Sequence, residues 1–302
     1  MCDDDGVGAS CKRLISYGIW PIVMIGSLAA AEWGFRRGIS VGRWAFVVSA
    51  ANFVVVFTLE RVLPRQQGVV RLRDPQLPKD IGHGILVGGL GRPLAAASAA
   101  GLIGVLSTSG ALDRHQRAWG SWPVSAQVAI ALLMSSFVGY WTHRWFHRFG
   151  WLWRFHAVHH DIAAMHVFKG NRIHLGEDVL RQFVALLPLY ALGAPSRVLV
   201  WIALWNNFEG ALAHSNVSQS IPSAAHWIVA TPQNHYVHHA VRRDLQDSNF
   251  AGFTPLWDIV FGTYRHPSRH PVDAVGIDNS TVPRGFLAQL AYPLRSDPSP
   301  SP

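Results

Sequence analysis

Histidines are concentrated in three short segments of this 302-residue chain. His143 and His147 lie four residues apart in "HRWFH", so a helix places both side chains on one face. The segments "HAVHH" and "HYVHH" follow the pattern H-x2-H-H, whose offsets of three and four residues also share a helix face. The histidines of the three segments are His143, His147, His156, His159, His160, His235, His238 and His239. His174 in "NRIH" and His214 in "LAHSN" complete the set of candidate metal ligands.

Metal binding explains why so many imidazoles occur together. Imidazoles that converge in a protein interior must stay neutral or repel one another, and burying them without partners costs free energy. A metal ion gives each ring lone pair a partner, and imidazole suits zinc, copper, iron and nickel. Because a single zinc ion is usually four-coordinate, eight to ten histidines predict two metal ions.

Two other kinds of metal chemistry fit the pattern less well. The zinc-protease signature HExxH is absent, since Arg144, Trp145 and Phe146 stand between the first two histidines. Haem needs only one or two axial ligands and would leave the other segments unexplained. Cys2 and Cys11 form no CxxC motif, so the ligands must be histidines or carboxylates.

Long apolar runs precede these segments and predict an all-α integral membrane protein. Only 15% of the residues are charged, whereas soluble domains average about 25%. A helix needs about 20 apolar residues to cross a bilayer. Four uncharged runs come close to this length, at residues 14–31, 44–59, 93–112 and 118–142. We therefore expect about four transmembrane helices.

The sequence also predicts irregularities around these helices. The second run is short, but it can begin at residue 41 if Arg43 extends its charged end towards the membrane surface. Pro93 is expected to kink any helix that continues upstream of the third run. Two further runs, 182–196 and 198–208, are too short to span and predict interfacial or re-entrant helices.

The chain thus divides into four predicted regions. These are an N-terminal tail (1–13), transmembrane helices (14–142), a histidine-rich catalytic region with interfacial helices (143–270) and a C-terminal tail (271–302), whose end "SDPSPSP" is expected to be disordered. Lysines and arginines in the loops place the histidine region on the cytoplasmic side, as a helical cap. The net charge of +8 belongs to these membrane flanks. No basic helix or aromatic RNA-binding motif indicates nucleic acid as a partner.

Four stretches resemble the fatty acid hydroxylase / sterol desaturase superfamily of membrane enzymes. They are "YWTHRWFHRFGWLWRFHAVHH", "HSNV", "TPQNHYVHH" and "DSNFAGFTPLWDIVFGTY", and the resemblance covers roughly residues 130–266. Two positions depart from the family pattern. Leu175 stands where the family often has proline, and His166 stands where asparagine is common. His166 is either a substitute hydrogen-bond donor behind the metal ligands or a packing residue, and we expect the second role.

The resemblance implies a non-haem di-iron enzyme that hydroxylates or desaturates a lipid with O2 and external electrons. It carries the ligand role over to the eight histidines of the three segments, with His214 and His174 as the ninth and tenth ligands. Zinc could replace iron in the isolated protein. The resemblance also implies a separate electron donor of the ferredoxin or cytochrome b5 type, because the sequence contains no segment of either kind.

The reaction and the ligand geometry make further demands. Oxidising an unactivated C–H bond requires a redox-active metal, which excludes zinc as the working ion. Metal-bound histidines usually donate their second ring N–H to a carboxylate or a carbonyl. Asp161 and Glu177 are the predicted partners, unless they only balance nearby arginines. The segment "WDIVFGTY" is expected to be structural, with Trp257, Phe261 and Tyr264 as packing residues.

The sequence leaves a second function class open, a membrane carrier or sensor that binds zinc or copper through histidines. An ion path would need ionisable residues within the membrane, and the four long runs contain no Asp, Glu, Lys or Arg. This counts against transport. The lipid substrate remains open among sterols, fatty acids, alkyl glycerols, hopanoids, carotenoids and ornithine lipids, as does the choice between hydroxylation and desaturation.

Overall fold

The computed structural model describes residues 6–67, 74–108, 110 and 112–295. These residues form helices and connecting loops, and their extended pairing is limited to two isolated β-bridges. The all-α prediction is therefore confirmed. The segment "SDPSPSP" at 296–302, for which we expect disorder, lies outside the described residues, as do residues 1–5 of the predicted N-terminal tail.

Four helical stretches are long and apolar enough to cross a membrane, as expected. They are Leu14–Arg36 within α1 (Gly6–Arg36), α2 (Val41–Val62), Leu77–Ser107, and α6 (Val124–Arg148). The helix α1 begins eight residues before the predicted span, inside the region assigned to a tail. The helix α2 does include Arg43, as the sequence predicts.

The third stretch is irregular next to Pro93. The helix α3 (Leu77–Leu86) continues through a π-helical turn, η1 (Val87–Gly91), into α4 (Arg92–Ser107). The stretch is thus helical throughout, with a π-turn where the sequence predicts a kink. Proline has no N–H for the preceding turn, and its ring crowds the carbonyl four residues earlier. A π-turn changes the spacing of the carbonyls at this point, so the chain stays helical.

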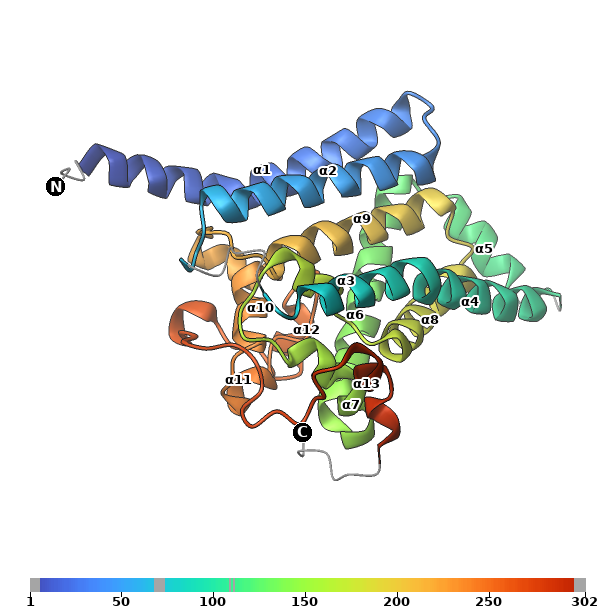
Figure 1. The fold of residues 1–302 in the computed structure, drawn as a ribbon. Helices are drawn as coiled ribbons and strands as arrows, with labels where there is room; N and C mark the ends of the chain where they lie inside the picture. Colours follow the sequence, from blue (N-terminus) through green and yellow to red (C-terminus); the bar gives the residue numbers. More distant parts are fainter. Residues whose placement is uncertain (1–5, 68–73, 109, 111, 296–302) are drawn as a thin grey trace.

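Two further helices, α8 (Leu175–Ala191) and α9 (Ser196–Ala213), pack against the candidate spans (Figure 1). The helix α9 lies along the hairpin of α1 and α2, and α8 packs on α4. Gly91 allows the second contact, because a Cβ there would lie 3.0 Å from Asp178 Oδ2 and 3.1 Å from Leu175 Cδ1. The runs at 182–196 and 198–208 thus belong to two helices that begin earlier or end later than the apolar residues.

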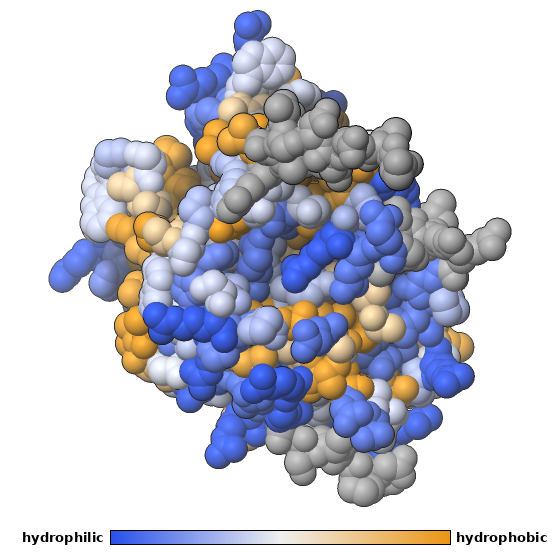
Figure 2. Space-filling model, turned by 90° about the vertical axis from the view of Figure 1, so that its left-hand side faces the viewer, coloured by the Kyte–Doolittle hydropathy of each residue, from blue (hydrophilic) through white to orange (hydrophobic). Residues whose placement is uncertain are grey.

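The remaining helices are short and lie mainly around the C-terminal half of α6. They are α5 (Asp113–Gly120), α7 (Gly150–His160), α10 (Pro232–His238), α11 (Arg243–Gln246), α12 (Leu256–Val260) and α13 (Phe286–Leu290). Short 3-10 turns occur at Val167–Asn171 (η2), Ser223–Trp227 (η3), Pro267–Arg269 (η4) and Tyr292–Leu294 (η5). Figure 2 shows the side of the molecule at the left of Figure 1, where hydrophilic residues cover much of the surface and hydrophobic patches lie between them.

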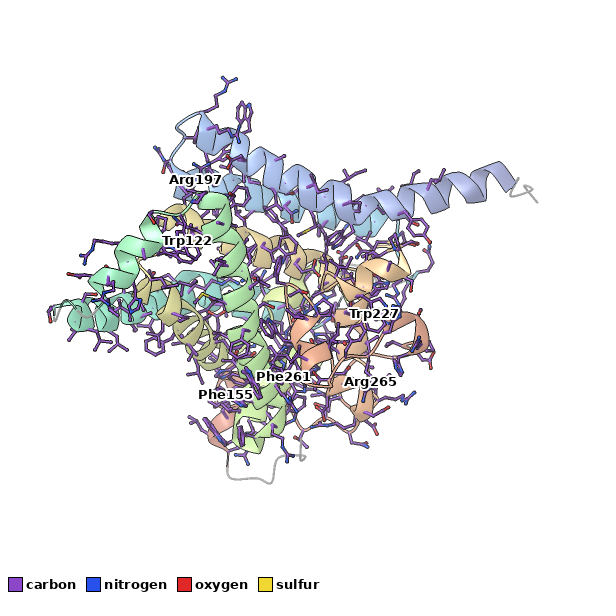
Figure 3. The ribbon with its side chains drawn as sticks, turned by 180° about the vertical axis from the view of Figure 1, so that it is seen from behind. Trp122, Phe155, Arg197, Trp227, Phe261 and Arg265 are labelled. Carbon is purple, nitrogen blue, oxygen red and sulfur yellow. The ribbon has the colours of Figure 1, made fainter. Side chains whose placement is uncertain are left out.

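The helix α6 connects the two ends of the molecule (Figure 3). Trp122, just before α6, lies near Arg197 at one end, whereas Phe155 and Phe261 lie towards the other end. The C-terminal half of α6 therefore reaches the region of α7 and α12. Residues 271–295, part of the predicted C-terminal tail, also pack there, since Val282 and Tyr292 are buried against Trp153.

Candidate metal centre

Local structure brings the three histidine segments face to face. The helix α6 ends at Arg148 and α7 begins at Gly150, with only Phe149 in an extended conformation between them. This sharp turn folds the histidine face of α7 onto that of α6. The third segment is fixed by α10, which begins with a capping box between Thr231 and Asn234. Such a cap satisfies backbone N–H groups that the first turn leaves free.

The ring nitrogens converge in two groups. The five-histidine group contains His143, His147, His156, His160 and His238, and the four-histidine group contains His159, His214, His235 and His239. Within each group, one nitrogen of every ring lies within 4.8 Å of those of the others. The two groups are adjacent, because their members alternate along α7 and α10, and the rings of His160 and His239 stack with centroids 4.3 Å apart.

The nitrogen spacings match those around a metal ion. In the five-histidine group, Nε2 of His156 lies 3.0 Å from that of His143 and 3.1 Å from that of His160. In the four-histidine group, Nε2 of His235 lies 2.8 Å from that of His214 and 3.0 Å from that of His239. Two nitrogens that each lie about 2.1 Å from one ion, at roughly a right angle, would be about 3 Å apart.

Hydrogen bonds on the outer side of the rings fix their tautomers. Nδ1 of His143 donates to the carbonyl of Phe250 (2.9 Å), and Nδ1 of His156 donates to Glu177 Oε1 (2.7 Å). Both Nε2 atoms are then unprotonated, and their lone pairs face each other across 3.0 Å. A cation between the rings would relieve the repulsion of these lone pairs.

The other outward bonds follow the same rule. Nδ1 of His159 donates to the carbonyl of Arg172, Nδ1 of His214 to that of Gly210, and Nδ1 of His238 to that of Ser248. Within the two groups, three buried imidazole nitrogens have no hydrogen-bond partner among the described residues, namely Nε2 of His147 and Nδ1 of His160 and His239. The donor set of neutral imidazoles therefore fits a pair of transition-metal ions.

Burial keeps these imidazoles neutral. Loss of hydration lowers the pKa of His214 to about 4, and it lowers the pKa values of His156, His160 and His239 well below the usual value. Neighbouring imidazoles lower the last three further, because a second positive charge would be repelled. Neutral imidazole is the form that binds metal ions.

Glu177 and Asp161, the two predicted partners, have different contacts. Glu177 is fully buried and accepts from His156 and, at 3.0 Å, from Arg181. Among the described residues, Asp161 makes no hydrogen bond to a histidine of either group, and its Oδ2 instead lies 3.4 Å from Arg172 Nη2. Only Glu177 is thus in direct contact with a candidate ligand, while Asp161 balances an arginine.

His174 lies outside both groups, unlike the other nine predicted ligands. It precedes α8, where its Nδ1 accepts from the N–H of Gly176 (3.0 Å) and its Nε2 donates to the carbonyl of Leu290 (3.0 Å). Both ring nitrogens are occupied by these bonds. His174 therefore caps α8 in this structure, and the ligand role that the resemblance implies stays a prediction.

Two carboxylates that the sequence analysis did not select support the site. Asp247 accepts from Nδ1 of His147 at 3.1 Å. Asp258, in "WDIVFGTY", accepts from the N–H groups of Phe250 and Ala251, and so holds the carbonyl to which His143 donates. The sequence signals are the resemblance of "DSNF" and "WDIV" to family segments and, for Asp247, its place shortly after the third histidine segment.

The aromatic residues of the same segment pack as expected. Phe261 stacks on Tyr140 with centroids 5.3 Å apart, and Trp257 meets Phe137 edge-on at 4.9 Å. The hydroxyl of Tyr264 donates to the carbonyl of His226. His166 lies outside the two groups and contacts Asp74, with Nε2 2.9 Å from Oδ2.

Comparisons with known proteins match the same region. The model of the fatty acid hydroxylase family matches residues 128–263, which contain all nine converging histidines. An ornithine lipid hydroxylase of Rhizobium tropici is 32% identical over 279 residues, covering 91% of this chain and 83% of the relative. No solved structure matches the chain significantly.

Other relatives match less than half of the chain. The human alkylglycerol monooxygenase is 30% identical over 137 residues, which cover 44% of this chain and 29% of the relative. Methylsterol monooxygenase 1-3 of Arabidopsis thaliana is 28% identical over 147 residues, 46% of this chain and 48% of the relative. With its four candidate spans and its converging histidines, the chain belongs to the fatty acid hydroxylase family, a family of lipid-modifying oxidoreductases.

Proposed function

We propose that the protein is a di-iron, O2-dependent hydroxylase of a membrane lipid. One observation carries the proposal: nine imidazoles meet in two adjacent groups, with no proton available to separate the lone pairs of His143 and His156. The metals would be held by the five-histidine group and the four-histidine group. A pair of redox-active ions supplies the oxidant that zinc cannot provide.

The overall reaction defines what else the enzyme needs. One atom of O2 enters a C–H bond as a hydroxyl group and the other leaves as water, which requires two electrons and two protons. We propose that a separate one-electron carrier, a ferredoxin or a cytochrome b5-like protein, supplies the electrons. The histidine region, residues 143–270, would then face the cytoplasm, where such carriers are reduced.

The side chains around the ligands orient the rings and tune the metals. Glu177 and Asp247 each accept an N–H from a ligand, which fixes the ring and increases its basicity. Backbone carbonyls do the same for four other rings. The replacement of carboxylate ligands by neutral imidazoles leaves the metals more positive, which favours their reduced state.

An apolar pocket beside the centre fits a lipid tail. The pocket has a volume of about 450 Å³ and lies between α4 and the first turns of α8, where Leu94, Leu175, Leu180 and Phe183 line it. Gly176 and His174 also line it, and Glu177 follows them in the chain. The pocket thus borders the helix turn that holds His156. We propose that an acyl chain of the substrate occupies it.

An ornithine-containing lipid is the first substrate to test. The ornithine lipid hydroxylase of Rhizobium tropici aligns with almost the whole chain, whereas the sterol and alkylglycerol enzymes align with less than half of it. The named relatives are hydroxylases and monooxygenases, which favours hydroxylation over desaturation.

The test is the lipid profile of membranes that contain ornithine lipids, with and without this protein. We expect a product that is heavier by one oxygen atom, formed from 18O2 with 18O incorporation. The His238→Ala variant should form none, although it still inserts into membranes. Unchanged lipids with the wild-type protein, together with a purified protein that holds only zinc or copper, would instead favour the metal carrier or sensor.

A further inference from the structure

A buried network of charged side chains lies beside the four-histidine group. Asp80 lies at the start of α3. Its Oδ2 accepts a hydrogen bond from Nζ of Lys169 (2.8 Å), and its Oδ1 accepts one from Nη1 of Arg172 (2.9 Å). All three side chains are at most 1% exposed. Lys169 also contacts Asp74 Oδ2 and Gln76 Oε1, each at 3.0 Å. We call Asp74, Asp80, Lys169 and Arg172 the ion network.

The ion network is not a third metal site, although Asp74, Asp80 and His166 are close enough to hold an ion. The ammonium group of Lys169 already lies within 3.0 Å of both carboxylates. A metal ion would have to displace this cation and leave it buried without a partner, which is costly. The carboxylates therefore serve the two cations of the chain itself.

Arg172 connects the ion network to the metal centre by two bonds. Its Nε donates to the carbonyl of Val158 (2.8 Å), the residue before His159. Its own carbonyl accepts from Nδ1 of His159 (3.1 Å). Arg172 therefore holds both the backbone and the ring of the same ligand. Its guanidinium group is itself held by Asp80 at 2.9 Å and, at the longer distance of 3.4 Å, by Asp161.

We propose that Asp80 is a positioning residue for the metal centre: through Arg172 it sets the orientation and tautomer of His159 in the four-histidine group. The third candidate span thereby supports one of the two metal sites and not the other. The five-histidine group does not depend on this route, because its outward bonds end on Phe250, Asp247, Glu177 and Ser248. This inference rests on the proposed two-metal function.

The charge of Asp80 is the feature to remove. Asp80→Asn keeps the shape of the side chain but leaves Arg172 and Lys169 short of one negative charge. Loss of an outer partner of a metal ligand typically weakens metal binding by roughly 10–100-fold. We expect this loss at one metal site only, and we expect Asp80→Glu to recover most of the affinity.

The experiment titrates Co(II), which is visible by absorption, into the full-length metal-free protein in detergent. Wild-type protein should bind two ions, and Asp80→Asn should bind one ion normally and the second roughly 10–100-fold more weakly. The matched control is Asp244→Asn, because Asp244 pairs with Arg242 at the surface, where both side chains are more than 60% exposed. The control should titrate like the wild type.

Two normal sites in Asp80→Asn would overturn the positioning role, and so would equal weakening of both sites. If Asp80→Asn does not fold, the Arg172→Lys variant tests the proposal instead. A lysine at this position keeps the positive charge but cannot reach both Asp80 and the carbonyl of Val158. Normal binding of two ions by Arg172→Lys would also overturn the proposal. A wild-type protein that binds only one ion would overturn the proposed function and this inference together.

Discussion

Glu177 and His156 form a fully buried pair in which Oε1 lies 2.7 Å from Nδ1. The carboxylate comes from the first turn of α8 and the imidazole from α7. The bond directs the unprotonated Nε2 of His156 towards His143 and His160. One helix that supplies no metal ligand thus determines which nitrogen of a central ligand is free to bind metal.

Glu177→Gln is expected to weaken metal binding and lower turnover by roughly 10–100-fold. The amide can accept the same hydrogen bond, but it removes the negative charge that increases the basicity of the ring. Metal content by mass spectrometry and turnover of the lipid measure the effect. Asp247→Asn should have a smaller effect, because Asp247 is 41% exposed and water can replace it. A larger loss in Asp247→Asn would contradict the assigned roles.

His159→Ala is expected to abolish turnover and to reduce bound metal from two ions to one. The side chain of His159 belongs to the four-histidine group, and its Nε2 lies 3.2 Å from Nε2 of His214. The five-histidine group keeps all its rings, so one metal should remain. The measurement is the metal content of variant protein that elutes like the wild type in size-exclusion chromatography. Full activity would exclude the assigned centre.

His174→Ala distinguishes a helix cap from a ligand. The variant should keep both metal ions and lose about 1 kcal/mol of stability, the usual effect of removing an N-cap side chain. Thermal unfolding in detergent and metal analysis together measure this. Loss of a metal ion from this variant would show that His174 is a ligand after all.

Leu180→Trp tests the apolar pocket. The larger side chain should fill part of the space between α4 and α8, raise KM for the lipid and leave the metal content unchanged. Leu133→Trp is the matched control, since Leu133 and Leu180 are both 39% exposed and only Leu180 lines the pocket. Equal kinetics of the two variants would place the lipid tail elsewhere.

The metal-free protein should lose stability as the pH falls. Burial holds the pKa of His214 at about 4 and lowers the pKa of His239, whereas in the unfolded chain a histidine titrates near about 6.5. The unfolded state therefore binds more protons between these values. The stabilisation is fully present above about pH 6.5 and is lost towards pH 4. Unfolding temperatures between pH 8 and pH 5 check this, and a constant value over that range would contradict it.

The sequence predicts the spans and the histidine faces because both depend on local periodicity. Runs of uncharged residues mark the four candidate spans, and the spacing of His143 and His147 marks one helix face. The pairing of the three segments with His214 rests on the family resemblance, because spacing alone does not show which distant faces meet.

Other features depend on contacts that no local pattern encodes. "NRIH" precedes α8, where a histidine can serve as a ligand or as a cap, and the bond to Leu290 selects the second role. Asp80 and Arg172 are far apart in sequence, so their ion pair could not be foreseen. The π-turn before Pro93 is a similar case, because the proline predicts an irregularity at this point but not its form.

The most direct test of the central claim is the number and identity of metal ions in freshly purified full-length protein. The nine converging histidines predict two iron ions per chain, with a Mössbauer spectrum of nitrogen-ligated, non-haem iron. A protein that binds only a single iron ion per chain after full reconstitution with iron would contradict the account.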